Sequence, residues 1–288
     1  MPVRSGIMVS MNRLSTAHRA RIVAALVEGN SLRATARMCD VSKNTVMKLL
    51  VDLGEACVSY QDATLRNLTC RRIQCDEIWA FCHSKAKNVA PEHEGVFGYG
   101  DVWTWTAIDA DTRLVPSWLV GLRNGACAVA FIEDLASRLA HRVQLSTDGH
   151  KPYLEAVEGT FGSEIDYAQV IKLYESEPGS ETRYSPAQCI GIEKRVIQGQ
   201  PDEAYISTSY VERQNLTMRM SMRRFTRLTN AFSKKVENLE AAVALHYMWY
   251  NFGRKHQSLA GRTPAMAAGV ASRVWTVAEI AALLDKPK

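Results

Sequence analysis

The segment RRIQCDEIWAFCH at residues 71–83 marks the point where the character of the chain changes. It is rich in aromatic and β-prone residues, which favours a β-strand. After a loop that contains Pro and Gly, DVWTWTAID at 101–109 alternates Trp and Thr with a period of two, and RLVPSWLVG at 113–121 follows a tight turn. Together these segments predict an antiparallel meander of three strands over 71–121.

Beyond the meander, helical and strand patterns alternate. Helical spacing occurs over 125–140 and 151–161, and strands are expected over 141–149 and 165–175. This order is typical of a mixed five-stranded sheet covered by helices, so we assign the core to the mixed α/β class. Residues 176–205 are polar and broken by Pro and Gly, and we interpret them as an insertion of uncertain structure. Further helices are predicted at 208–228 and 236–252.

Upstream of the first strand, the chain has the pattern of three short capped helices. They are expected to begin near Ser15, Ser31 and Ser42, and the third is expected to stop at Gly54. A tight turn at 39–41 separates the second helix from the third. This spacing is typical of a helix-turn-helix, whose last helix enters the major groove of DNA. The residues expected to reach bases and phosphates are Ser42, Lys43, Asn44, Thr45 and Lys48.

Charge supports a polyanionic partner more by its distribution than by its total. The net charge is +5 over 288 residues. Residues 1–50 contain eight Lys and Arg against two acids, Glu28 and Asp40. A small helical bundle that contacts only proteins is the alternative, and the basic bias favours DNA. A second basic run without acids follows Glu212 over 213–235: Arg213, Arg219, Arg223, Arg224, Arg227, Lys234 and Lys235.

Cysteine usage and hydropathy exclude several classes of protein. The seven cysteines are scattered, and their odd number argues against a secreted disulfide framework. The spacing of Cys70, Cys75, Cys82 and His83 fits no common zinc pattern. The sequence shows no signal peptide and no apolar stretch long enough to span a bilayer. We therefore expect a cytoplasmic protein without a membrane partner.

Three acidic residues stand out by position. Asp76 lies midway along the first strand, Asp148 lies where the fourth strand ends, and Glu212 opens a helix. In a mixed sheet of this order the first and fourth strands are neighbours, and the later helix packs across them. Converging carboxylates select hard cations, which indicates Mg²⁺ or Mn²⁺ and two ions roughly 3.5–4 Å apart that clamp a phosphoryl displacement.

Each acid also has a simpler interpretation. Asp148 precedes Gly149 and is also typical of a turn. Glu77 is expected on the opposite side of the strand from Asp76, and it is an alternative functional residue. Glu212 at the start of a helix also complements the helix dipole. No spacing rule links the three acids.

Several long blocks of the chain resemble DDE-type transposases of bacterial insertion sequences, and most closely the IS-one family. SLRATARMCDVSKNTVMKLL resembles that family's helix-turn-helix, and CDEIWAF, STDGHKPY and SYVERQNLTMRM resemble its catalytic blocks. HYMWYNFGRKHQSLAGRTPAMAAGV resembles its C-terminal signature. The resemblance implies an RNase H-like core, an acidic triad of Asp76, Asp148 and Glu212, and dependence on Mg²⁺.

The implied reaction is DNA cleavage at the terminal inverted repeats of an element, followed by strand transfer into target DNA. Because two ends must be joined, a homodimer or larger assembly is expected. Residues expected near the DNA after the triad glutamate are Arg213, Asn215, Arg219, Arg223 and Arg224.

The expected organisation begins with a helix-turn-helix domain at 11–55, because the first ten residues show no periodic pattern. A linker at 56–70, a catalytic core at 71–255 and a C-terminal helical segment at 256–288 follow. Two other functions remain open. One is a DNA-binding regulator that has lost its chemistry, and the other is an RNase H-like nuclease that cleaves branched DNA.

Overall fold

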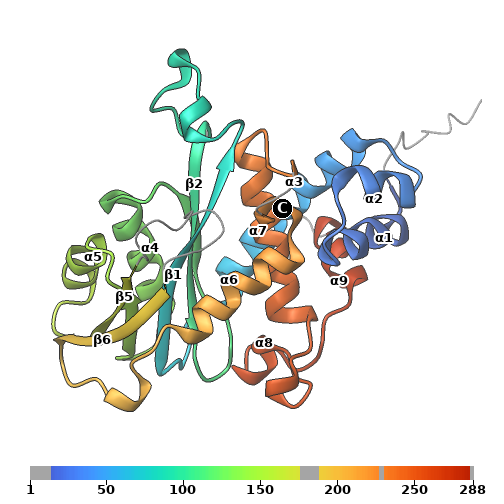
Figure 1. The fold of residues 1–288 in the computed structure, drawn as a ribbon. Coiled ribbons are helices and arrows are strands. Elements are labelled where there is room, and N and C mark those ends of the chain that lie inside the picture. The colour runs from blue at the N-terminus through green and yellow to red at the C-terminus, as the bar shows by residue number, and fades with distance from the viewer. Residues whose placement is uncertain (1–13, 176–187, 227–229, 286–288) are drawn as a thin grey trace, which may run out of the picture.

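A six-stranded mixed sheet forms the centre of the computed structural model, which describes residues 14–175, 188–226 and 230–285 (Figure 1). The strand order is β3-β2-β1-β4-β5-β6. The strands are β1 (Arg72–Cys82), β2 (Gly100–Asp109), β3 (Trp118–Gly121), β4 (Gln144–Asp148), β5 (Asp166–Glu175) and β6 (Gln188–Gln198).

The sheet confirms the predicted meander and the predicted neighbours. β1 pairs antiparallel with β2, and β2 pairs antiparallel with β3. β4 pairs parallel with β1 and with β5, so the first and fourth strands do lie side by side. The antiparallel β1–β2 pair continues into a loop that projects beyond the rest of the sheet (Figure 1).

The predicted strand count of five is wrong, because part of the assumed insertion is the sixth strand. β6 pairs antiparallel with β5 and forms one edge of the sheet. Most of its side chains are exposed, including Ile190 and Ile192, and charged residues follow them. An exposed edge strand lacks the buried alternation that marks a strand in a sequence. Residues 176–187 of the expected insertion lie outside the described residues.

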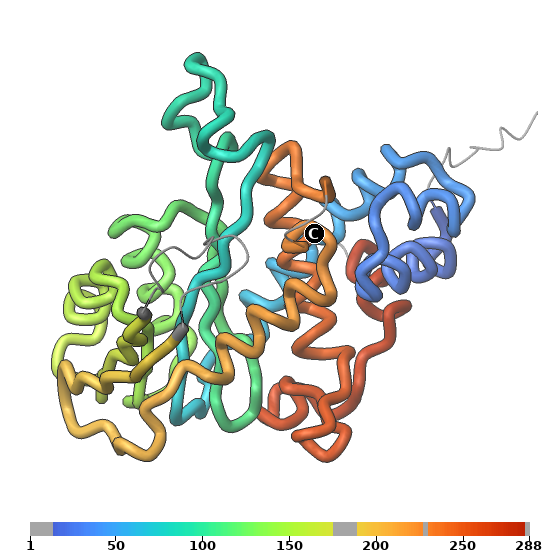
Figure 2. Tube along the Cα trace, in the orientation of Figure 1, coloured from blue at the N-terminus to red at the C-terminus, as the bar shows by residue number. Residues whose placement is uncertain are grey.

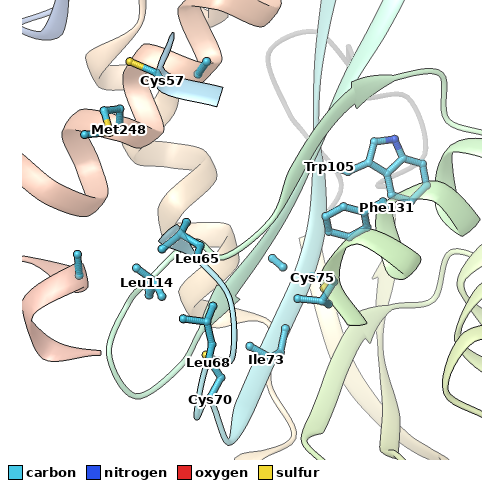
Figure 3. Close-up of a cluster of buried hydrophobic side chains, with 14 of the residues drawn as sticks. Cys57, Leu65, Leu68, Cys70, Ile73, Cys75, Trp105, Leu114, Phe131 and Met248 are labelled. Carbon is cyan, nitrogen blue, oxygen red and sulfur yellow. The ribbon is translucent and has the colours of Figure 1, made fainter. Parts of the chain in front are cut away.

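Helices cover both faces of the sheet. One face packs against α4 (Gly125–Arg138) and α5 (Pro152–Phe161), and the other packs against α6 (Ser209–Ser221) and α7 (Val236–Met248). Alternate residues of β1 divide between these layers, since Ile73 and Cys75 belong to one buried cluster and Ile78 to another. The larger cluster continues past Leu65 and Leu114 to the helices beyond the sheet (Figure 3).

Three helices precede the sheet and share a small core of their own. They are α1 (Thr16–Val27), α2 (Leu32–Met38) and α3 (Lys43–Thr64), and the side chains of Ser15, Ser31 and Ser42 cap them as predicted. Their core contains Ile22, Ala36, Cys39, Val46 and Leu49.

The expectation that the third helix stops at Gly54 is wrong. α3 is a single helix of 22 residues, and Gly54 is buried against α7. A Cβ atom at this position would lie 2.5 Å from the Cβ of Ala241. Glycine therefore allows two helices to approach closely here instead of ending one of them.

The last helices of the described chain lie against the first helix. After α7 come a π-helical turn (Trp249–Gly253), α8 (Pro264–Ala267) and α9 (Val277–Ala281), and α9 packs on α1 (Figure 2). The predicted capping box of Thr276 and Glu279 is present at α9.

α6 ends at Ser221, so the basic run that follows Glu212 does not continue along one helix. None of the helices in the described part of the chain is long and apolar enough to cross a membrane.

Candidate active site

Asp76 and Asp148 lie at adjacent positions of two parallel strands. The register of β1 and β4 pairs Cys75 with Thr147, so the next residue on each strand is one of the two acids. β4 ends at Asp148, whereas β1 continues to Cys82. The predicted convergence of these acids follows directly from the pairing of the two strands.

Glu77 joins these two acids, which the sequence analysis did not expect. One carboxylate oxygen from each of Asp76, Glu77 and Asp148 lies within 4.8 Å of the others. Strand alternation places Glu77 on the opposite face from Asp76. Glu77 is paired with Trp105 of β2 on one side, but on the other side β4 has ended at this level, so no strand separates the two faces of the sheet there. We refer to these three residues as the acidic cluster.

Burial and repulsion between carboxylates make ionisation of Asp76 and Glu77 unfavourable. Burial, followed by the charges of Glu77 and Asp148, raises the pKa of Asp76 to about 7. Burial, followed by the charge of Asp148, also raises the pKa of Glu77, although Tyr153 and Arg123 oppose this effect. The Oε1 atom of Glu77 and the hydroxyl of Tyr153 are buried without a well-formed hydrogen bond in the described structure. A cation at this position would relieve the repulsion.

Arg123 supplies part of the missing positive charge. Its Nε donates to Oε2 of Glu77 at 3.0 Å, and its Nη2 donates to Oδ2 of Asp148 at 3.3 Å. The guanidinium carbon lies 5.0 Å from the ring centroid of Trp103. The other oxygen of Asp148 accepts a hydrogen bond from the backbone N–H of His150 at 3.0 Å. Arg123 therefore bridges two members of the acidic cluster.

Glu212 lies in the first turn of α6, near the acidic cluster but outside it. Its Oε2 forms an ion pair with Lys172 of β5 at 2.6 Å, and its Oε1 accepts a hydrogen bond from Thr208 at 2.6 Å. Its charge contributes to the raised pKa of Asp76, so the two carboxylates interact. Glu212 is thus held beside Asp76 and is neutralised by a lysine from the neighbouring strand.

Asn215 is buried and belongs to the same group of side chains. Its Nδ2 donates to Oδ2 of Asp76 at 2.8 Å, whereas its Oδ1 has no partner in the described structure. From the sequence we expected Asn215 to contact DNA, whereas the structure places it against the carboxylate of Asp76. Asn215 follows Glu212 by three residues, so the two side chains share one face of the helix, and this spacing could have predicted that Asn215 belongs to the site.

Gln74 fixes the helix that carries Glu212, and sequence reasoning missed it. Its Oε1 accepts hydrogen bonds from the backbone N–H groups of Tyr210 at 2.8 Å and Val211 at 3.2 Å, which begin α6. Gln74 is buried and lies two residues before Asp76, on the same face of β1. Arg123 and Lys172 were also missed, because they are distant in sequence from the acids that they contact.

The remaining residues expected to bind DNA form two groups. At the start of α3, Lys43, Asn44 and Lys48 are exposed, and the Ser42 hydroxyl accepts a hydrogen bond from the backbone N–H of Thr45 at 3.0 Å. On and after α6, Arg213 and Arg223 are exposed, whereas Arg219 and Arg224 are partly buried.

Comparisons with known proteins give only weak likenesses. No protein-family model and no curated protein matches the chain. Among solved structures, a Mos1 transposase paired-end complex with left transposon end is 15% identical, with a TM-score of 0.24, over 55% of this chain and 60% of that one. A Mos1 strand transfer complex is 13% identical, with a TM-score of 0.25, over 84% and 79% of the two chains. A pre-cleavage Mos1 transpososome is 9% identical, with a TM-score of 0.21, over 83% and 81%.

The chain spans about 60% of the length of the first of these structures. At these TM-scores the likeness identifies neither the fold nor the function of this chain.

Proposed function

We propose that this chain is a DDE-type transposase, an enzyme that cleaves DNA at the ends of an insertion sequence and transfers the strands into target DNA. The observation that carries the proposal is the meeting of Asp76 and Asp148 at neighbouring positions of parallel β1 and β4, with Glu77 and Glu212 beside them. The sequence blocks around these acids resemble the IS-one family. An RNase H-like core is the corresponding proposal for the mixed sheet.

The donor set fits a divalent metal ion. The side chains of Asp76, Glu77 and Asp148 offer only oxygen, and burial and nearby carboxylates raise the pKa of Asp76 and of Glu77, an effect that a cation would oppose. Hard oxygen donors suit Mg²⁺ or Mn²⁺ better than softer metals. When bound, one or two such ions would activate the attacking oxygen and stabilise the leaving oxygen of a phosphodiester. We assign metal binding to Asp76, Asp148 and Glu212, and Glu77 is the alternative third acid.

The protein's own residues would position the reacting groups. Asn215 holds one oxygen of Asp76, and Gln74 holds the start of the helix that carries Glu212. Arg123 and Lys172 form ion pairs with the carboxylates, and each would face the phosphate when an ion takes over its acidic partner. In the proposed reaction water attacks a phosphorus atom at the element end, and the 3′-hydroxyl of the element leaves. That hydroxyl then attacks a phosphodiester of the target, joins to its phosphorus atom and releases a 3′-hydroxyl of the target strand.

The N-terminal helices are the proposed end-binding module. We assign the helix-turn-helix to 11–55, the linker to 56–70, the catalytic core to 71–255 and a helical segment to 256–288. DNA contacts are assigned to exposed residues at the start of α3 and to the basic side chains on and after α6. A homodimer or larger assembly follows from the need to join two ends.

Strand cleavage and joining on DNA that carries the gene's flanking ends tests the proposal. With Mg²⁺, the protein should cut at the 3′ ends and join them to a target, whereas Asp148→Ala should do neither. Glu155→Ala is the matched control, because Glu155 is an exposed acid on α5 outside the site. Binding to the ends without cleavage by the unmodified protein would contradict the proposed enzyme and favour a regulator.

The same assay separates a nuclease from a transposase. Cleavage of branched DNA without end preference and without joining would indicate a structure-specific nuclease. Glu77→Gln and Glu212→Gln then show which of the two glutamates is the third metal ligand. The variant that lacks this ligand should lose both cleavage and divalent-ion binding. If only Glu77→Gln had this effect, the assignment of Glu212 would be wrong.

A further inference from the structure

β6 forms a long open edge of the sheet, on the side of the molecule away from the N-terminal helices (Figure 1). It has 11 residues and pairs with β5 on one side. None of the strands or bridges in the described part of the chain pairs with its other side. The strand at the opposite edge, β3, has only 4 residues. Since a strand rises about 3.4 Å per residue, β6 presents a free backbone edge of about 37 Å.

This edge carries apolar side chains of the kind that strands normally bury. Ile190 and Ile192 are 61% and 59% exposed, and Val196 is also exposed. Strand alternation places these three side chains on one face of β6, with Lys194 between them. Tyr174 of the neighbouring β5 is exposed beside the same end of the strand. An unpaired apolar edge strand is a template for pairing with another chain.

Three charged residues in the middle of β6 restrict what can pair with it. Glu193 and Arg195 share the other face and form an exposed ion pair at 3.0 Å. Lys194 lies between them in sequence, and its Nζ donates to the carbonyl of Glu203 on its own chain at 2.7 Å. Charges on an edge strand oppose indiscriminate pairing, so a partner must place opposite charges at these positions.

A second copy of β6 meets this requirement in one register. When two identical strands pair antiparallel about a two-fold axis perpendicular to the sheet, one residue lies opposite itself. With Glu193 or Arg195 at the centre, that residue faces its own charge, and with Ile192 or Val196 at the centre neither charge faces an opposite one. With Lys194 at the centre, each Glu193 faces Arg195 of the second copy. Each Ile192 then faces Val196, and the two Lys194 side chains are already held on their own chains.

We propose that β6 is a homodimer interface, in which antiparallel pairing centred on Lys194 joins two six-stranded sheets into one continuous sheet. The strand's charges and its β-branched residues complement a second copy of themselves, which identifies the partner. The choice of a second copy also rests on the proposed function, because two element ends must be joined.

The same register relates the two candidate active sites to each other. Asp148 lies opposite Val170 of β5, and Val170 lies opposite Lys194 of β6, so the three residues form a line across the sheet that ends at the two-fold axis. The path β4–β5–β6–β6–β5–β4 crosses five strand spacings of about 4.8 Å, which puts the two Asp148 residues about 24 Å apart along the sheet. A two-fold axis perpendicular to the sheet keeps both sites on the same face. The dimer therefore presents both sites to one target.

Sedimentation equilibrium of the full chain without DNA tests the interface. The unmodified protein should form dimers. Glu193→Arg and Arg195→Glu each place like charges opposite one another at two symmetry-related positions, and each should weaken dimerisation at least about tenfold. The double variant restores opposite charges and should dimerise within about threefold of the unmodified protein. Glu92→Arg, on the exposed loop between β1 and β2, is the matched charge reversal and should change nothing.

Three results would each overturn the proposal. They are an unmodified protein that stays monomeric at submillimolar concentration, single variants that dimerise as tightly as Glu92→Arg, and a double variant that does not recover. Glu193 and Arg195 are both exposed, and recovery in the double variant excludes misfolding as the cause of the single losses.

Disulfide crosslinking tests the register. In a Cys189→Ser background, which removes the exposed native thiol of β6, oxidised Lys194→Cys should form a covalent dimer because residue 194 faces itself. Opposite residues of an antiparallel pair lie about 4.5–5.5 Å apart between Cα atoms, within the range of a disulfide. Arg195→Cys should not crosslink with itself, but it should crosslink when mixed with Glu193→Cys. Self-crosslinking of Arg195→Cys without that of Lys194→Cys would contradict the register.

These measurements separate failure of the interface from failure of the enzyme. Dimerisation is measured without DNA or metal ions, so a monomeric protein that cleaves and joins DNA would contradict only the interface. Conversely, a dimer that responds to the charge reversals as expected and never cuts DNA would contradict only the proposed enzyme.

Discussion

At the scale of single residues, the acidic cluster makes stability depend on pH. The pKa of Asp76 is about 7 in the fold and 3.8 for an ordinary aspartate. Between these values the folded protein keeps a proton that the unfolded chain releases. The free energy of unfolding therefore falls as pH rises from about 4 to about 7.

Asp76→Asn should remove this dependence in metal-free buffer. Because asparagine does not ionise, the variant should lose less stability between pH 5 and pH 8 than the unmodified protein, by on the order of 2 kcal/mol. Thermal melts in EDTA at the two pH values measure the difference. Parallel pH profiles for the two proteins would show that Asp76 does not titrate as the structure indicates.

Asn215 distinguishes a positioning role from a DNA contact. Asn215→Ala removes the hydrogen bond to Oδ2 of Asp76 and should lower the cleavage rate about 10- to 100-fold. Its affinity for duplex DNA in EDTA should stay within about twofold of the unmodified protein, since one neutral buried side chain adds no phosphate contact. Leu216→Ala, on the exposed side of α6, serves as the control. Equal losses of affinity and cleavage would instead support the role expected from the sequence.

At the scale of elements, the α3–α7 crossing depends on a glycine. Gly54→Ala favours the helix by roughly 1 kcal/mol through propensity, but its Cβ would lie 2.5 Å from the Cβ of Ala241. Overpacking typically costs about 1–3 kcal/mol, so we expect net destabilisation in chemical unfolding. Gly159→Ala is the matched control, because no atom lies within 4 Å of the added Cβ inside α5. If both variants were stabilised, the close contact at Gly54 would be refuted.

Elements marked by alternating residue types or by capping residues could be predicted, and those without such a mark could not. The Trp and Thr alternation of β2 and the caps of the first three helices gave correct elements. β6 was missed because it is an exposed edge strand whose pairing partner, β5, is set by long-range contact. Asp76 and Asp148 were brought together by a correct strand order, whereas the roles of Glu77 and Asn215 depend on where β4 ends and how α6 is held.

At the scale of the whole molecule, contacts from α9 and from Asp285 hold α1 against the rest of the fold. The side chain of Arg19 in α1 is buried, and its Nη2 forms an ion pair with Asp285 at 2.7 Å. Its Nη1 also donates to the carbonyl of Ala281 in α9 at 3.3 Å. Patterns within the sequence gave no sign of this contact, which joins residues 266 positions apart.

Asp285→Ala should loosen the N-terminal helices. It leaves a buried guanidinium without its carboxylate, which should cost about 1–3 kcal/mol and increase amide hydrogen exchange in α1. Arg273→Gln, which removes an exposed ion pair with Glu279 in the same region, should change little. If amide hydrogen exchange in α1 were unchanged in Asp285→Ala, the ion pair between Arg19 and Asp285 would not be what holds this helix in place.

Divalent-ion binding by Asp76, Asp148 and a third acid, Glu212 or alternatively Glu77, is the central claim, and titration of Mn²⁺ followed by electron paramagnetic resonance tests it most directly. We predict one or two bound ions per chain at neutral pH, with binding lost in Asp148→Asn and retained in Glu155→Gln. If the unmodified protein bound no Mn²⁺ at millimolar concentration, or if Asp148→Asn bound it equally well, the carboxylates would not form a metal centre.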